Sequence, residues 1–155
     1  MDSVHITVCD HENSEAAVSL LSAQSQEHDI ATSAECLREV THAVVAEPRL
    51  GFILLAVFDG APIGLAYAAS HLSAEHGGTI GWLEELFVQP EWRSRGVGSL
   101  LLDGTLTRAE NLGWRGLELE VVAGHERALS LYRRHGFQPL FRARFCRIFP
   151  PQIPS

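Results

Sequence analysis

The stretch LEELFVQPEWRSRGVGSLLL, residues 83–102, decides the fold of this 155-residue chain. Its apolar first part predicts a buried strand, Pro90 ends that strand, and a helix follows a turn that contains Gly96 and Gly98. Glycine lets a backbone approach a ligand closely. The first turn of a helix offers free N–H groups and the positive end of the helix dipole, both of which favour phosphate.

Two arginines stand just before these glycines, and each adds fixed positive charge with a forked set of donors. We therefore predict that the turn binds a pyrophosphate-bearing ligand. The residues of this predicted site are Arg93, Ser94, Arg95, Gly96, Val97, Gly98 and Ser99. The turn is not a Walker loop, because no Gly-Lys-Ser/Thr follows, and it lacks the third glycine of a dinucleotide fingerprint. From these residues alone, a structural turn with solvated arginines remains the alternative.

A second motif, ALSLYRRHGF at 128–137, carries a family resemblance. It resembles the pattern Ala-x-x-Leu-Tyr-x-x-x-Gly-Phe, while RSRGVG fits Arg/Gln-x-x-Gly-x-Gly/Ala. In order and separation the two motifs are similar to those of the GNAT superfamily of acetyl-coenzyme A-dependent N-acetyltransferases. The strand LEELFV further resembles that of spermidine/spermine acetyltransferase-like members. The resemblance covers 83–137, and the first half of the chain matches only in its order of elements.

Composition bounds the remaining possibilities. A chain with 46% hydrophobic residues has room for one domain with a proper core, which we place at 1–150 with a tail at 151–155. No apolar run reaches 18 residues and the N-terminus lacks a secretory pattern, so we expect no membrane segment. The scattered Cys9, Cys36 and Cys146 predict a reducing, cytoplasmic location. A net charge of −7 disfavours nucleic acid as a partner.

The pattern of elements predicts an α/β fold with helices on both faces of a mixed sheet. Asp59-Gly60 predicts a hairpin, and a capping box of Thr32 and Glu35 predicts the start of a helix. Strands are expected at 4–8, 52–58, 63–70, 79–88, 116–122, 137–141 and 143–149, and helices at 15–26, about 33–47, 97–112 and 126–135. Strand 116–122 should run parallel to strand 79–88. The GNAT resemblance implies a mostly antiparallel sheet of six to seven strands with about four helices.

Two adjacent carboxylates, Glu84 and Glu85, interrupt the apolar central strand. In a regular strand they would face opposite sides, so only one would enter a cleft. An ion pair with Arg115 or Arg142 is the structural alternative, since an unpaired buried carboxylate is costly. The functional interpretation is a general base that removes a proton from an amine before it attacks. The resemblance implies this role for Glu84, with Glu85 as the second candidate.

The resemblance also implies a catalytic role for Tyr132. Coenzyme A leaves as a thiolate, and a model thiol has a pKa of about 8.5 against about 10 for tyrosine. A neutral phenol beside that sulfur can donate its proton or form a hydrogen bond to the developing charge. A core tyrosine on the helix stripe is the alternative. By the same resemblance, a main-chain N–H near Leu86 or Phe87 polarises the acetyl carbonyl, and the strand through Val88 pairs with the pantetheine amides.

The chain departs from the family pattern at two positions. Ser94 stands where many members have glycine, and His125 stands where an asparagine commonly precedes the helix and contacts the cofactor. We still expect His125 and Ala128 to lie at the cofactor.

The predicted function is acetyl transfer from acetyl-CoA to a primary amine of a small molecule or peptide, in a ternary complex and without a metal. By analogy Glu27, His28 and Asp29 are candidates for amine recognition, although a plain polar loop is the alternative. A catalytically weak acyl-CoA sensor or interaction module is the competing hypothesis, and a nucleotide-binding protein is a third. GNAT members often dimerise through late strands or helices, so the resemblance allows a homodimer, but no residue of the sequence decides it.

Overall fold

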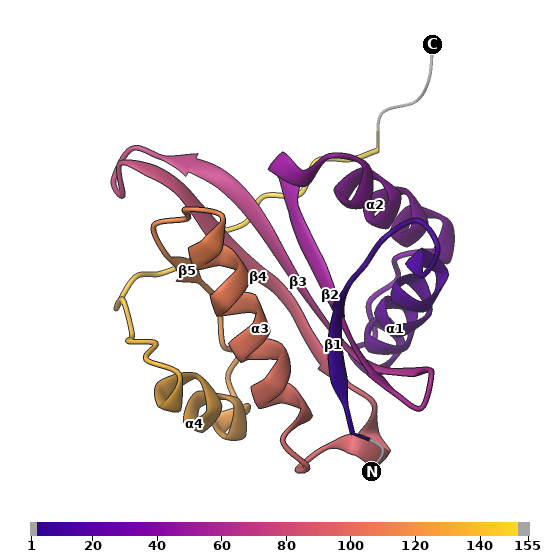
Figure 1. Cartoon of the computed structure of the whole chain (residues 1–155). Coiled ribbons are helices and arrows are strands. Elements are labelled where there is room, and N and C mark those ends of the chain that lie inside the picture. The colour runs from indigo at the N-terminus through magenta and orange to yellow at the C-terminus, as the bar shows by residue number, and fades with distance from the viewer. Residues whose placement is uncertain (1–2, 152–155) are drawn as a thin grey trace.

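A computed structural model describes residues 3–151 of the chain as a twisted sheet between two layers of helices (Figure 1). The sheet has five strands in the order β1-β2-β3-β4-β5; the first three pairings are antiparallel and the last is parallel. The strands are β1 His5–Val8, β2 Gly51–Phe58, β3 Ala61–Ser73, β4 Gly78–Val88 and β5 Leu117–Glu118. The helices are α1 Ser14–Glu27, α2 Ala34–Ala46, α3 Val97–Asn111 and α4 Glu126–Arg134. Short 3₁₀ turns span Pro48–Leu50 and Pro90–Trp92.

The β2–β3 hairpin forms where the sequence predicts it. Asp59 and Gly60 have φ values of 49° and 76°, the pair of positive values that a type I′ turn requires. This turn sets Phe58 opposite Ala61, and the meander continues through β4.

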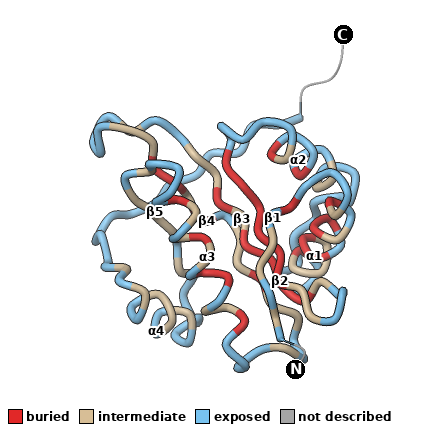
Figure 2. The backbone as a smooth tube through the Cα atoms, viewed as in Figure 1, coloured by how far each residue is buried: buried red, intermediate tan, exposed pale blue. Residues whose placement is uncertain are grey.

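Each face of the sheet carries its own apolar core. The buried residues, red in Figure 2, lie along the strands and along the helices on both sides of the sheet. On one face α3 packs Val97, Leu101 and Leu102 against the strands. On the other face α1 and α2 contribute a second core, formed by Ala17, Leu20, Leu21 and Val44. Helices on both faces of the sheet confirm the predicted architecture. The C-terminal end of β4 leads through a short turn to the start of α3.

The N-cap of α2 lies one residue later in the sequence than predicted. Ser33, not Thr32, is the N-cap, and its hydroxyl accepts a hydrogen bond from the backbone N–H of Cys36 at 3.1 Å. Ser33 has the extended backbone that an N-cap needs. Both hydroxyl residues fit the cap, so the sequence pattern alone could not separate them.

The central strand β4 is irregular at its two carboxylates. Tyr67 pairs with Glu85 and Ala68 pairs with Leu83, so Glu84 is the extra residue of a β-bulge. The expectation that Glu84 and Glu85 face opposite sides holds only for a regular strand and does not apply here. Arg142, one of their suggested partners, instead binds Glu75 at 2.6 Å.

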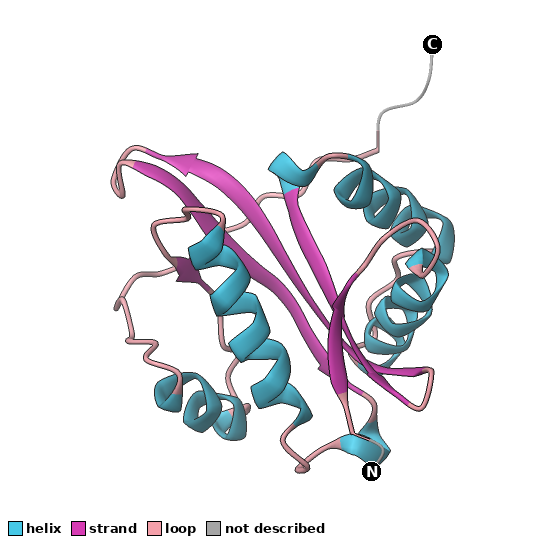
Figure 3. Ribbon diagram, viewed as in Figure 1, coloured by secondary structure: helices cyan, strands magenta, loops and turns pink. Residues whose placement is uncertain are grey.

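The end of the chain differs from the prediction (Figure 3). Strand β5 has two residues rather than the seven expected at 116–122, although it is parallel to β4 as predicted. The strands expected at 137–141 and 143–149 are absent from the described part of the chain, so this prediction is wrong and the sheet has five strands instead of six to seven. Pro139 cannot donate to a strand ladder, and Phe141 has a φ of 55°, outside the β region.

Candidate active site

The glycine turn joins β4 to α3 as predicted. Gly96 is the N-cap of α3 with a φ of 83°, a backbone conformation that favours glycine. Its carbonyl accepts the first helical hydrogen bond, from the N–H of Leu100 at 3.1 Å. The N–H groups of Val97, Gly98 and Ser99 therefore precede the hydrogen-bonded part of the helix and are available to an anion.

Ser94 adopts a φ of 62° in the same turn. Left-handed backbone is costly for a residue with a Cβ, so glycine would suit this position better. The Ser94 side chain is exposed at this corner.

A hollow of about 250 Å³ connects the turn with the second motif. Three elements form its wall: the end of β4, the turn with the start of α3, and α4. The lining residues are Leu86, Val88, Trp92, Arg93, Ser94, Gly98, Ala128, Leu131 and Tyr132. The structure thus brings together residues of two motifs that lie about 35 positions apart in the sequence.

Other predicted cofactor residues lie outside this wall. Phe87 and Val97 are buried in the two cores, where their side chains pack rather than bind. Arg95 lies over the Trp92 ring at 5.1 Å. The lining also lacks Gly96, Ser99 and His125. Gly96 and Ser99 could therefore contact a ligand only through their main-chain atoms. Leu131 was not predicted; its spacing of three from Ala128 on one helix face is the signal that could have found it.

Burial raises the pKa of the Tyr132 hydroxyl. The phenol therefore stays protonated well above neutral pH, as a proton donor requires. Its ring packs edge-on against Phe137 with 5.7 Å between centroids, which holds the side chain at the wall of the hollow.

Arg93 ties the turn to the end of α1. Its guanidinium donates to a carboxylate oxygen of Glu27 at 2.6 Å and to the carbonyl oxygen of Val88 at 2.9 Å. The hydrogen bond from Arg93 holds the pKa of the Glu27 carboxyl below its usual range. The rings of His28 and His125 lie 6.0 Å apart. The contact of Glu27 with Arg93 therefore places the start of the segment predicted for amine recognition beside the glycine turn.

The two carboxylates of β4 differ in environment. Burial raises the pKa of Tyr67, and the charges of Glu84 and Glu85 raise it further. Burial also raises the pKa of Glu85, with a further contribution from the charge of Glu84 and an opposing hydrogen bond from Gln24. Glu84 is exposed, whereas Glu85 is half-buried. The bulge thus supplies one carboxylate in water and one with an increased affinity for a proton.

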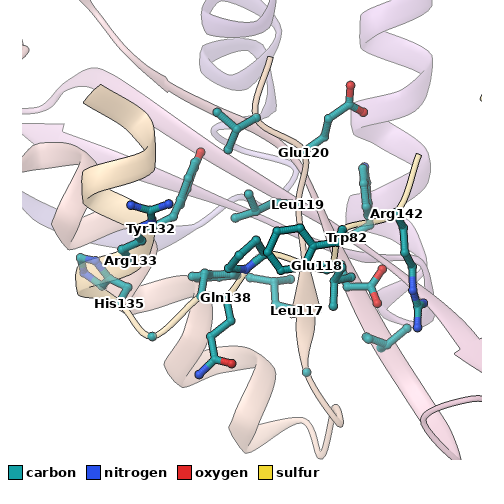
Figure 4. Close-up of a pocket in the computed structure, with 18 of the residues that line it drawn as sticks. Trp82, Leu117, Glu118, Leu119, Glu120, Tyr132, Arg133, His135, Gln138 and Arg142 are labelled. Atoms are coloured by element: carbon teal, nitrogen blue, oxygen red, sulfur yellow. The ribbon is translucent and has the colours of Figure 1, made fainter. Parts of the chain in front are cut away.

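A larger hollow, of about 1150 Å³, lies between β5, α4 and the segment that follows α4. In Figure 4, Tyr132, Arg133 and His135 lie on one side of it and Leu117 and Leu119 on the other. The glycine turn does not contribute to its lining, and neither does the first turn of α3. The smaller hollow is therefore the candidate active site.

The described residues also bear on metals and membranes. Within 3–151, no group of three or more His, Cys, Asp or Glu side chains could hold a metal ion. None of the helices in that part of the chain has the length and apolar content needed to cross a bilayer.

Comparison with known proteins gives the family. The model of the acetyltransferase (GNAT) family matches residues 16–137, which include both motifs and the hollow between them. The chain belongs to the GNAT acetyltransferase family. Its likeness to spermidine/spermine acetyltransferases in particular stays a prediction.

Curated GNAT relatives match over different lengths. An aminoglycoside N(6′)-acetyltransferase type 1 of Stenotrophomonas maltophilia is 27% identical over 77% of this chain and 78% of its own length. An uncharacterised N-acetyltransferase of Methanocaldococcus jannaschii is 32% identical over 57% of this chain and 39% of its own. The bovine thialysine N-ε-acetyltransferase is 36% identical over 40% of this chain and 36% of its own. The chain therefore spans less than half of the latter two proteins.

Solved structures agree on the GNAT fold. An integron cassette protein from the Cole Harbour salt marsh metagenome has a TM-score of 0.84 and 24% identity, over 95% of this chain and 91% of that chain. The aminoglycoside N-acetyltransferase AAC(6′)-Iy in complex with CoA has a TM-score of 0.82 and 20% identity, over 96% of each chain. At these identities the likeness establishes the fold.

Proposed function

We propose that this chain transfers the acetyl group of acetyl-CoA to a primary amine of a small molecule or peptide, by direct attack in a ternary complex. The observation that carries the proposal is the hollow in which the glycine turn, the end of β4 and Tyr132 meet. A turn suited to phosphate and a half-buried phenol in one hollow fit a ligand that extends from one to the other.

The residues present fit the cofactor. The first N–H groups of α3 and the exposed guanidinium of Arg95 would hold the pyrophosphate, since both are positive and lie at one turn. The end of β4, with Leu86 and Val88 at the hollow, would pair with the pantetheine arm. When bound, acetyl-CoA supplies the activated acetyl group.

The carboxylates of β4 would remove a proton from the ammonium form of the acceptor, because only the free amine can attack. Glu84 is our predicted base and Glu85 the alternative; the raised pKa of Glu85 supports its ability to accept a proton. Main-chain N–H groups near Leu86 or Phe87 would stabilise the negative charge on the acetyl oxygen.

Tyr132 would donate its proton as the carbon–sulfur bond breaks, so that the coenzyme leaves as a thiol. The hydroxyl regains a proton from solvent after release. Its position in the wall of the hollow supports this role.

For the acceptor, Glu27, His28 and Asp29 remain the proposed recognition residues beside the turn. The names of two relatives, both aminoglycoside acetyltransferases, make amines with several amino groups the first class to try. A peptide N-terminus is the second class, and a cytoplasmic location is part of the same prediction.

The function is tested by following the release of free thiol from acetyl-CoA with a panel of amines, aminoglycosides and polyamines first. Glu84→Gln and Glu85→Gln are compared across pH. The variant that lacks the base should lose about 10²–10⁴-fold in rate, and the loss should be largest at low pH, where free amine is scarcest. A protein that releases thiol equally with and without every amine would contradict the proposal.

We also propose that a second copy of the chain covers the segment after α4. In this segment the exposed Arg142 and Arg144 form surface ion pairs with Glu75 and Glu120, at 2.6 Å and 2.7 Å. The large apolar side chains are left outward: Leu140, Phe141, Phe145, Ile148 and Phe149 are all exposed. Together they expose on the order of 700 Å², close to the roughly 800 Å² that each partner buries in a stable interface. The area therefore fits a homodimer.

A further inference from the structure

Arg93 joins separate parts of the chain beside the candidate active site. Its Nε atom donates to the carbonyl oxygen of Val88, the last residue of β4, at 2.9 Å. Its Nη2 atom donates to Oε2 of Glu27, the last residue of α1, at 2.6 Å. The guanidinium carbon also lies 5.6 Å from the centre of the Phe87 ring, within the range of a cation–π contact. Two of its three guanidinium nitrogens are therefore already engaged within the protein.

The second arginine of the turn, Arg95, is placed differently. Its side chain is exposed, and its guanidinium carbon lies 5.1 Å from the centre of the Trp92 ring. To bind a phosphate with the same atoms, Arg93 would have to give up its hydrogen bonds to Glu27 and Val88. Arg95 is therefore the better candidate for the pyrophosphate, and Arg93 is left with a different use.

The end of α1 has a closed backbone structure. The N–H of Ile30 donates to the carbonyl oxygen of Ser25 at 2.8 Å, and the N–H of Asp29 donates to that of Gln26 at 3.3 Å. Asp29 has a φ of 53°. These features form a Schellman motif, with Asp29 at the position where glycine is usual. Because Glu27 is the last residue of the helix, a contact that fixes Glu27 also fixes Asp29.

The chain around this motif is exposed to solvent. Every residue from 26 to 36 is exposed. The ring of His28 lies 6.0 Å from that of His125, the N-cap of α4. The end of α1 thus contacts both the glycine turn and the start of α4. Of these two contacts, the hydrogen bond between Arg93 and Glu27 is the stronger kind, because both of its partners are charged.

We propose that Arg93 is a positioning residue that holds Glu27, and with it His28 and Asp29, beside the hollow. The inference rests on the proposed function, in which this segment recognises the acceptor amine. Glu27 serves that recognition by placing the two residues that follow it. The hydrogen bond from Arg93 holds the pKa of the Glu27 carboxyl below its usual range, so the carboxylate stays charged and the contact persists at neutral pH.

Hydrogen exchange of the backbone amides of Asp29 and Ile30 tests the inference without cofactor or amine. Arg93→Gln and Glu27→Gln should each lower the protection factors of both amides by about fivefold, the effect of one partly exposed charged pair. The double variant should lose no more than either single variant, because each change removes the same contact. Arg95→Gln, in the same turn, is the matched control and should keep the wild-type protection.

Binding and kinetics separate the two arginines. The side chains of Arg93 and Glu27 are 42% and 38% exposed, so their variants should fold. Arg95→Gln should weaken the calorimetric affinity for acetyl-CoA by at least about tenfold, as loss of a charged hydrogen bond does, whereas Arg93→Gln should change it by less than about threefold. With neamine, a small aminoglycoside, as the acceptor, Arg93→Gln should raise KM for the amine by about fivefold and change kcat by less than about twofold.

An Arg93→Gln protein that keeps the wild-type protection of Asp29 and Ile30, or that loses acetyl-CoA affinity as Arg95→Gln does, would overturn the inference. A double variant whose loss is the sum of the two single losses would also overturn it, because the two side chains would then act independently. A wild-type protein that releases no thiol with neamine or any other amine would count against the proposed function, while the exchange experiment would still decide the role of Arg93.

Discussion

Burial acts in one direction on two side chains of the site and gives each a different use. It raises the pKa of Tyr132, which keeps the phenol protonated as a donor. It also raises the pKa of Glu85, which strengthens that carboxylate as an acceptor. The raised pKa makes the phenol a weaker acid, so only the change at Glu85 strengthens a proton transfer.

Replacing Tyr132 with Phe separates the chemistry of this residue from its packing. The ring contact with Phe137 remains in the variant, so the fold and acetyl-CoA affinity should be retained. We expect kcat to fall by about 10²–10⁴-fold, because the departing thiolate loses its proton donor. Steady-state kinetics and calorimetry on the same sample measure both quantities. An unchanged kcat would show that Tyr132 is only a packing residue.

Glu85 also makes stability depend on pH. A carboxyl whose pKa is raised in the folded state binds its proton more tightly there than in the unfolded chain, so folding is favoured at low pH. That contribution is fully present below the ordinary carboxyl pKa and is lost as pH rises through the raised value. Glu85→Gln should therefore increase the melting temperature at pH 7 and lose this advantage near pH 4. Thermal unfolding of both proteins across that range checks it, and equal curves at pH 7 would contradict it.

Helix α3 contributes both to the core beneath the site and to the hollow itself. Its buried face packs Leu101 and Leu102 on the sheet, and its first turn forms part of the hollow. Leu101→Ala should lower the free energy of unfolding by about 2–5 kcal/mol, because a fully buried side chain leaves a cavity. Leu100→Ala, on the exposed side of the same helix, should cost less than about 1 kcal/mol. Urea unfolding compares them, and similar losses in both would contradict this packing.

The elements with strong local signals were predictable. The alternation and turn residues of β1–β4 specify the meander, and Gly96, Gly113 and Gly136 mark helix boundaries at positive φ. The predictions that failed concern features that depend on contacts between residues distant in the sequence. The bulge at Glu84 arises from the register between β3 and β4, which a single strand does not encode. The apolar pattern after Gly136 predicts strands, but Pro139 lacks an N–H and Phe141 has a φ of 55°, so that segment forms no ladder.

The site could be predicted because the two sequence motifs that form it were both recognised. Seven of the nine residues that line the hollow were predicted as cofactor or catalytic residues. Phe87 was expected at the cofactor but faces the core of α1 and α2. The pairing of Arg93 with Glu27 was not predicted, because 66 positions separate them.

At the scale of the whole molecule, the exposed end of the chain predicts self-association. Phe141 is 94% exposed and Phe145 is 91% exposed. Changing both to Ser should weaken the proposed homodimer by at least about tenfold, because aromatic side chains dominate interface energetics. Leu112→Ser, an exposed apolar residue at the end of α3, is the control. Sedimentation velocity over a range of concentrations measures it. A wild-type monomer at every concentration would contradict the dimer.

The central claim is that the hollow between the glycine turn and α4 binds acetyl-CoA. Calorimetric titration of the purified protein with acetyl-CoA, with NAD as the control ligand, tests it most directly. The account predicts one site per chain for acetyl-CoA, no heat with NAD, and loss of the site in Gly96→Val, whose branched side chain is strained at a φ of 83°. A folded wild-type protein that does not bind acetyl-CoA, or a Gly96→Val protein that binds it with wild-type affinity, would contradict the account.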